Sequence, residues 1–467
     1  MTRDVVCLAL LAAGIAPAQN QPLDLSQQGE QEQTSRNQEP DDRQVQSQPT
    51  TDGPSILSRD SGWTSQRGGK LIGFRFYGEI TGVYDSGLTP AVASGQSNAV
   101  SAAGKGLEAG AGLIGSRAWR HSKFSVEYKG KYRQYINSPL LNGSDQFLAI
   151  EYKQLLQRHL SVDLKENLGT STLANGELAY FPVTGTNALA LPTNELFDVR
   201  TDYLQSSVDL LWDATPQLSV SFGGQGFLVR RESLALADLI GYTARSDVAY
   251  RLTRHQTISA SYNYVAFNFQ RTFADANLQI AALGYAIAFS RDWDFSAQAG
   301  AIRTETRGLN QIAIDPAIAA IIGQNIATVS FLRKAYLPVV EARLTRRWNR
   351  SQYMLAYSRT VTPGNGVYLT SRQSMGTISY AYMGYRRLAV RLNGEYAELS
   401  PLGQALGKYT NWQGGVRMTY TLARDVFLEL DYEHRYYTTQ DLGYRRDSTR
   451  LSLGLAFSPS ETPLAFW

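Results

Sequence analysis

Val426-Phe427-Leu428-Glu429-Leu430-Asp431-Tyr432-Glu433 alternates between two kinds of side chain. One set of alternate positions holds Val426, Leu428, Leu430 and Tyr432, and the other holds Phe427, Glu429, Asp431 and Glu433. Successive side chains of a β-strand point to opposite faces of the sheet. The segment therefore predicts a strand with one apolar face and one face that is mostly charged.

The same alternation recurs from residue 71 onward in segments of about 10 to 15 residues. Strands of soluble sheets average about five or six residues, whereas a tilted strand of about 9 to 11 residues crosses the hydrocarbon layer of a membrane. We expect about 18 strands, within a range of 16 to 20. They lie near residues 71–84, 105–118, 122–135, 145–157, 159–171, 200–213, 216–230, 240–252, 255–270, 276–290, 293–307, 328–347, 350–362, 371–384, 386–398, 409–422, 425–438 and 446–457.

The connections between these segments alternate in length. Tight turns such as Thr253-Arg254 and Ala423-Arg424 alternate with longer joints such as 172–199 and 308–327. Short turns at one end and long loops at the other are typical of outer-membrane barrels. The sequence therefore predicts an all-β, antiparallel, up-and-down transmembrane barrel, with both termini on the short-turn, periplasmic side.

Aromatic residues beside the short turns support this prediction. Tyr and Trp collect at membrane–water interfaces, where one ring edge is wet and the other is buried. The predicted girdle consists of Tyr250, Trp293, Trp348, Tyr385 and Tyr420. A soluble β-propeller is the alternative, but the blade-length repeats of that fold do not occur here.

The N-terminal residues differ from the rest of the chain. Arg3, an apolar stretch over 5–15 and a small-residue motif over 16–18 predict a signal peptide of residues 1–18, cleaved between Ala18 and Gln19. Residues 19–70 are rich in Gln and poor in aromatic residues, which predicts a disordered periplasmic segment. The barrel domain then spans 71–467. The only cysteine, Cys7, lies within the signal peptide, so the mature chain offers no thiol chemistry.

These features resemble Gram-negative outer-membrane β-barrel proteins of the porin-like kind. The last strand, Leu451-Ser452-Leu453-Gly454-Leu455-Ala456-Phe457, resembles the aromatic-ended signal that the barrel-assembly machinery reads, although ten residues follow it. Phe457 and the terminal Trp467 are both candidates for the recognised aromatic. The resemblance implies a location in the bacterial outer membrane, in contact with its lipid.

The residues show no catalytic constellation. His121, His159 and His255 fall at predicted short turns, and His434 points outward by its parity with Leu430. The histidines lack metal-ligand spacing, and we expect no enzyme activity, metal or cofactor. A net charge of +4 is too small and too dispersed to indicate nucleic-acid binding.

Charged residues concentrate on the predicted inner faces. An Arg or Lys facing lipid at mid-membrane costs about 2–4 kcal/mol, so these side chains should face water or one another. The candidate pore-lining residues are Lys129, Lys131, Arg133, Lys165, Arg245, Arg251, Arg343, Arg391, Arg417, Glu429, Asp431, Arg435 and Arg450. Arg-rich walls select anions, and the expected preference is mild, because pairing with carboxylates can cancel it.

We therefore expect a channel for small polar or anionic solutes. Two alternatives share these features: export of an anionic exopolysaccharide, and a plugged barrel with a structural or surface-binding role. Loop 308–327, with an Ile- and Ala-rich, helix-compatible stretch over 312–326, is one candidate constriction, and loop 172–199 is the other. Classical porins trimerise, so this chain could also form an oligomer. Its sequence shows no signature of an interface between subunits.

Overall fold

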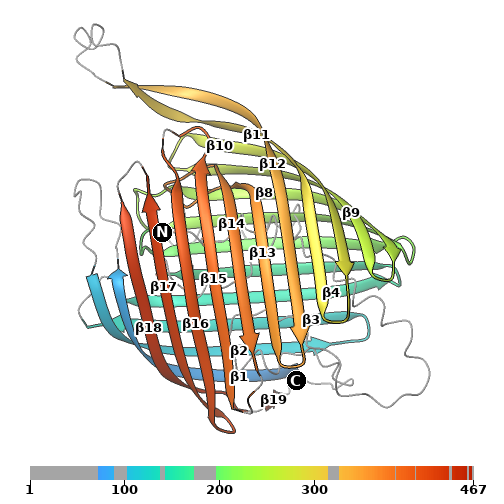
Figure 1. Cartoon of the computed structure of the whole chain (residues 1–467), viewed down its shortest axis with the longest axis vertical. Coiled ribbons are helices and arrows are strands. Elements are labelled where there is room, and N and C mark those ends of the chain that lie inside the picture. The colour runs from blue at the N-terminus through green and yellow to red at the C-terminus, as the bar shows by residue number, and fades with distance from the viewer. Residues whose placement is uncertain are drawn as a thin grey trace.

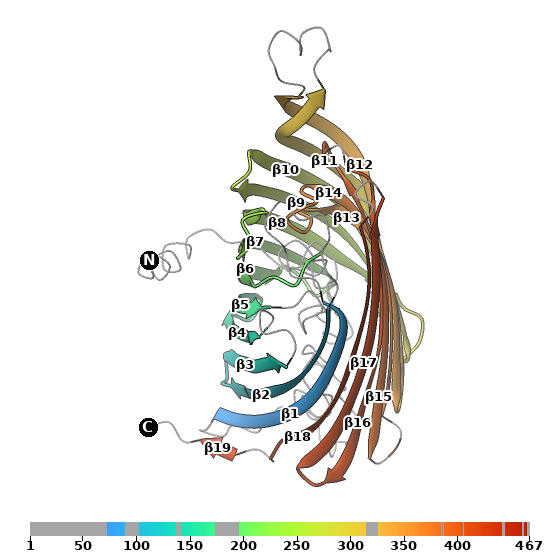
Figure 2. The same cartoon turned by 90° about the vertical axis from the view of Figure 1, so that its left-hand side faces the viewer.

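The chain forms one closed antiparallel β-barrel, shown from two sides in Figures 1 and 2. The computed structural model describes residues 72–88, 102–136, 142–172, 196–313, 326–383, 385, 387–404, 406–440, 444–459 and 462–464. Its strands are β1 (Ile72–Leu88), β2 (Ala102–Ala118), β3 (Ser122–Tyr135), β4 (Gly143–Gln157), β5 (Leu160–Ser171), β6 (Thr201–Asp213), β7 (Leu218–Arg231), β8 (Asp238–Thr253), β9 (Gln256–Gln270), β10 (Ala274–Ala288), β11 (Trp293–Ala313), β12 (Ile326–Trp348), β13 (Ser351–Thr362), β14 (Ser371–Tyr382), β15 (Leu388–Pro401), β16 (Tyr409–Ala423), β17 (Val426–Thr439), β18 (Arg445–Phe457) and the short β19 (Thr462–Leu464).

Pairing of the first and last long strands closes the barrel. β1 and β18 are antiparallel neighbours from Gly78↔Phe457 to Asp85↔Arg450. β19 continues the same side of β1, where it pairs with residues 72–74. Every long strand therefore has a neighbour on both sides, which removes the exposed sheet edges that an open sheet would leave unpaired.

The structure confirms the predicted fold class, an antiparallel up-and-down β-barrel, and the predicted positions of the strands. Each of the 18 predicted segments overlaps one of the strands β1 to β18. The predicted asymmetry of the connections is also present, with turns such as 254–255 and 424–425 at one end. The three-residue connection 271–273 is a short exception at the long-loop end, where Arg271 adopts a positive φ of 69°.

The prediction for loop 308–327 is wrong at both of its ends. β11 continues to Ala313 and β12 begins at Ile326, and these two residues face each other in the ladder. The pairing of β12 with β13 reaches only Val340↔Arg359, so the β11–β12 hairpin runs past its neighbours and projects beyond them (Figures 1 and 2). An apolar Ile- and Ala-rich stretch suits a strand as well as a helix, and here strand pairing extends into it from both sides.

Apolar side chains cover the outer wall. Ile80, Leu283 and Leu453 are 67%, 71% and 53% exposed, and their neighbours in sequence point inward. Near the short-turn ends, the predicted girdle residues Tyr250, Trp348, Tyr385 and Tyr420 are also exposed. An apolar band with aromatic residues at its rim is the surface expected of a barrel that sits in a membrane.

Among the residues that the structure describes, no helix is long and apolar enough to span a membrane. Several predicted features fall outside the described residues: the signal peptide with Ala18 and Gln19, the segment 19–70, the centres of both candidate loops (173–195 and 314–325), and Trp467.

Part of the inner wall is a dry apolar core. On β9, Ile258 and Tyr262 are exposed on the outside, whereas Val265, Phe267 and Phe269 alternate inward and are at most 3% exposed. They belong to a cluster that extends over β4 and β6 to β13. It also includes Phe147, Tyr203, Phe227, Leu239, Leu278, Ile280, Ile302 and Val339. Side chains this deeply buried do not line an aqueous path.

The parity of β18 predicts a sharp difference between adjacent substitutions. Leu453→Arg should lower the free energy of unfolding by about 2–4 kcal/mol, because it places a cation on the lipid-facing wall. Ser452→Arg should cost far less, because the inward-facing Ser452 lies opposite Asp431 in the ladder. Urea unfolding of the protein in vesicles measures both variants. Equal costs would contradict the assignment of the two faces.

Candidate functional site

The structure places every predicted pore-lining residue on an inward-facing position. On β5, for example, Leu164 and Leu168 are exposed outside, and Lys165 alternates with them. On β15 and β16, Arg391 and Arg417 lie directly opposite each other in the ladder. Most of these side chains lie on β3, β5 and β15 to β18, whereas Arg245, Arg251 and Arg343 lie on β8 and β12.

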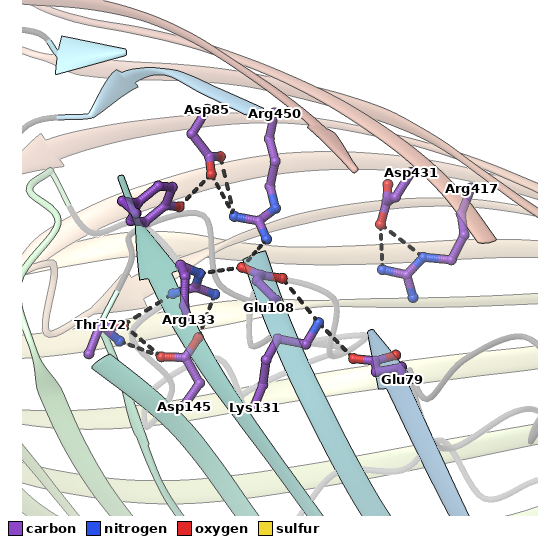
Figure 3. A network of polar contacts seen from close by, with 11 residues as sticks. Glu79, Asp85, Glu108, Lys131, Arg133, Asp145, Thr172, Arg417, Asp431 and Arg450 are labelled. Carbon is purple, nitrogen blue, oxygen red and sulfur yellow. Dashed lines mark hydrogen bonds and ion pairs between the residues drawn. The ribbon is translucent and has the colours of Figure 1, made fainter. Parts of the chain in front are cut away.

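Glu108 of β2 is the centre of a buried charge network (Figure 3). Its carboxylate accepts hydrogen bonds from Arg133 Nε and, at 2.5 Å, from Arg450 Nη2. Lys131 Nζ lies 3.6 Å from the other oxygen. The Glu108 side chain is 1% exposed, so three cations from β3 and β18 neutralise a carboxylate that water does not reach.

The network continues across the seam between β18 and β1. Arg450 Nη1 of β18 also lies 3.1 Å from Asp85 Oδ2 of β1. The hydroxyl of Tyr135, on β3, donates a hydrogen bond to the same carboxylate. Ion pairs therefore tie together the strands that close the barrel.

On its other side the network reaches β4. Arg133 Nη2 lies 2.8 Å from Asp145 Oδ2, and the Asp145 carboxylate accepts hydrogen bonds from the backbone and side chain of Thr172. Lys131 Nζ lies 3.0 Å from Glu79 of β1. Figure 3 shows these groups pointing toward one another from separate strands.

Ion pairs also neutralise several of the other inward cations. Arg417 Nη2 lies 2.7 Å from Asp431, and Lys129 Nζ lies 2.9 Å from Glu127. Further pairs are Lys165 with Asp163 and Glu151, and Arg245 with Asp247 and Asp209. The excess of inward cations is therefore smaller than a count of Arg and Lys suggests, and most of the cationic side chains are held in place.

The segment before β6 crosses the interior. Strands β1 to β5 stand between β18 and β6 in the barrel. Nevertheless, Asp198 forms a 2.6 Å ion pair with Arg446 of β18, and both side chains are at most 2% exposed. The hydroxyl of Tyr437, on β17, donates to the carbonyl of Leu196. The end of predicted loop 172–199 thus contacts the opposite wall.

The β13–β14 loop makes a second crossing. Strands β8 to β12 separate β13 from β7, yet the backbone N–H of Ala237 donates to the carbonyl of Gly366 at 3.0 Å. Gly366 has φ of +87° and lies against the Arg231 guanidinium, and a Cβ there would be 3.0 Å from Nε. Only glycine suits this left-handed backbone in so close a contact.

The two crossings meet in an aromatic cluster at the long-loop end. Leu196 packs with Tyr368 of the β13–β14 loop and with Tyr409 and Tyr437 on the wall. Arg435 lies beside this cluster and donates to Asn411 Oδ1 at 3.0 Å and to the hydroxyl of Tyr409 at 3.3 Å. The loops therefore narrow the interior, and the charged wall lies next to the narrowing.

Several of these residues were not predicted. The alternation alone could have found Glu108, because Leu107 and Leu113 mark the outer face of its strand. Asp198 and Gly366 lie in connections, where no periodicity assigns a direction. Their contact partners depend on the path of each loop across the barrel, which the sequence pattern does not specify.

The four histidines lie at separate places in the barrel. His121, His159 and His255 lie at the short turns, and His434 contacts Thr449 at 3.1 Å. No group of three or more His, Cys, Asp or Glu side chains that could hold a metal ion occurs among the described residues.

No family model matches the sequence, and no curated protein matches it. Solved structures that it resembles include OpdQ of Pseudomonas aeruginosa, at 10% identity and a TM-score of 0.42 over 84% of this chain and 98% of that chain. OccK2 (OpdF) of Pseudomonas aeruginosa, solved in complex with glucuronate, gives 12% identity and a TM-score of 0.43, covering 83% and 98%. The outer membrane protein opdK from Pseudomonas aeruginosa gives 12% and 0.40, covering 83% and 99%.

Glu108→Gln should destabilise the barrel by about 3–5 kcal/mol, because the substitution leaves buried cations without their carboxylate. Glu305→Gln is the matched control. It breaks ion pairs with Lys334 and Arg303 that face solvent on the β11–β12 hairpin, and such pairs contribute little. Urea unfolding in vesicles compares the two, and an equally small effect at Glu108 would contradict a structural role for the network.

Proposed function

We propose that the protein is an outer-membrane channel for the passive passage of small polar or anionic solutes. The observation that carries the proposal is a closed barrel with an apolar outer wall and a charged inner wall. Charged side chains on an inner wall stabilise a water-filled path, and a barrel of this strand number is wide enough to hold one. The short-turn end then faces the periplasm.

The position of the path follows from the division of the interior. The dry core lies on β4 and on parts of β6 to β13, and most of the inward cations lie on β3, β5 and β15 to β18, so solutes would move along that charged side. There Arg391 lies opposite Arg417, and Arg435 lies beside the narrowing. A planar guanidinium that bonds a carboxylate through two N–H groups suits small organic acids.

The two crossings favour small solutes over a polysaccharide chain. Leu196 contacts β17, and Gly366 contacts the β7–β8 connection and the end of β7, so a wide uninterrupted passage would require both contacts to break. They also give physical support to the alternative of a plugged barrel, and conductance distinguishes the plugged barrel from the channel.

Planar-bilayer recording of the refolded mature protein tests the channel. We expect stable ohmic conductance and, in a salt gradient, a reversal potential near zero or slightly toward anions, since most inward cations are paired. Arg391→Glu should shift the reversal potential toward cations. Arg303→Glu makes the same charge change on the outer face of β11 and should leave it unaltered. A folded sample without conductance would contradict the proposal.

Replacing residues 173–199 with a short turn should raise the conductance, because the contacts of Leu196 and Asp198 with the opposite wall are lost. The replacement is feasible because Ser171 and Thr201 are direct partners in the ladder. Replacing residues 311–328 at the end of the β11–β12 hairpin should leave conductance unchanged, because that hairpin runs past its neighbours. If instead the replacement of 311–328 raised the conductance and the replacement of 173–199 did not, the constriction would not be formed by residues 173–199.

A further inference from the structure

Two tryptophans enclose an arginine on the outer wall of the barrel. The guanidinium carbon of Arg346, on β12, lies 4.7 Å from the ring centre of Trp293 and 3.9 Å from that of Trp348. Arg346 and Trp293 are direct cross-strand partners, and Trp348 follows two positions along β12, on the same face. All three side chains therefore face away from the interior, beside the short turn 349–350.

A similar arrangement with one ring lies at the end of β2, where Trp119 is the first residue of the following turn. The guanidinium carbon of Arg117 lies 4.8 Å from the ring centre of Trp119. Arg117 pairs with Phe124 on the outward face of β3, and Trp119 is 44% exposed. This second site also lies at the short-turn end, beside residues 119–121.

Neither arginine has a hydrogen-bond acceptor or a carboxylate partner among the described residues. The Nε atoms of Arg117 and Arg346 are buried without a hydrogen-bond partner, and neither guanidinium forms an ion pair with the residues that the structure describes. The inward arginines Arg133, Arg417 and Arg450 behave differently, because each pairs with a carboxylate. A cation held between aromatic faces without an internal anion is arranged for an anion from outside.

The surroundings restrict the nature of that anion. The sites lie where the apolar outer band meets the short turns, which is the level of lipid headgroups in a membrane. Arginines also occur in nearly all of the short turns: Arg120, Arg158, Arg254, Arg291, Arg350, Arg387 and Arg424. Asp292 and Asp425 offset only part of this charge, so the rim favours an anionic lipid over a neutral one.

We propose that Arg346 with Trp293 and Trp348, and Arg117 with Trp119, are binding sites for the phosphate group of an anionic membrane phospholipid. The guanidinium binds the phosphate through its N–H groups, the indole rings hold the guanidinium in place, and the acyl chains lie along the apolar wall. Solutes in the interior do not reach these outward side chains. The proposal rests on the membrane location in the proposed function, but not on the conduction of solutes.

Native mass spectrometry of the detergent-solubilised protein, titrated with phosphatidylglycerol, tests the sites. The variants are Arg346→Gln and Arg117→Gln, with Arg303→Gln as the control, because Arg303 faces outward on β11 but pairs with Glu305. We expect Arg346→Gln and Arg117→Gln each to weaken phosphatidylglycerol binding about fivefold. Trp348→Leu should also weaken binding, and the control should bind as the wild type does. Equal binding by Arg346→Gln, Arg117→Gln and Arg303→Gln would overturn the proposal.

Two further arms identify the source of the phosphate and need no variant. Inorganic phosphate should compete only weakly, since it lacks acyl chains, and diacylglycerol, which lacks the phosphate, should not occupy the sites. Binding of diacylglycerol equal to that of phosphatidylglycerol would overturn the role of the arginines. The conductance of Arg346→Gln should equal that of the wild type, because the lipid sites lie outside the pore. If the wild-type barrel bound phosphatidylglycerol but did not conduct ions, only the proposed channel would be contradicted.

Discussion

Backbone hydrogen bonding at the seam between β1 and β18 is the constraint on which the rest of the structure depends. Strands surrounded by lipid must pair all of their backbone N–H and C=O groups within the protein, and the ladder from Gly78↔Phe457 to Asp85↔Arg450 completes that pairing. The same register brings Arg450 to Glu108 and Asp85. Closure therefore creates the buried charge network, and the network in turn opposes opening of the seam.

The closed wall is divided in its chemistry. Val265 and Leu278 belong to a core that water does not reach, whereas Arg391 and Arg417 belong to the charged side. The contacts of Leu196 and Gly366 cross between walls and narrow the space that remains. In the proposed channel, a narrow passage beside a charged wall would restrict both the size and the charge of a solute, which favours a small solute over a polymer.

Much of the fold could be predicted because the period-two alternation is local. The pattern of residues 426–433 assigns each side chain to a face without knowledge of its neighbours, and its recurrence sets the number of strands. The partners of Arg450 could not be predicted, because they belong to strands at the other end of the sequence. Loop contacts such as Asp198–Arg446 depend on the three-dimensional path of the chain. The ends of the β11–β12 hairpin were mistaken for loop, because an apolar run does not itself distinguish strand from helix.

Cysteine accessibility tests the division of the wall most directly, since the only native cysteine, Cys7, lies in the predicted signal peptide. Single cysteines would replace the inward Asn393 on the charged side, its outward neighbour Leu392, and the inward Val265 of the dry core. With the barrel in vesicles, a water-soluble, membrane-impermeant thiol reagent should modify only the cysteine at position 393. Protection at 393 together with modification at 265 would contradict it.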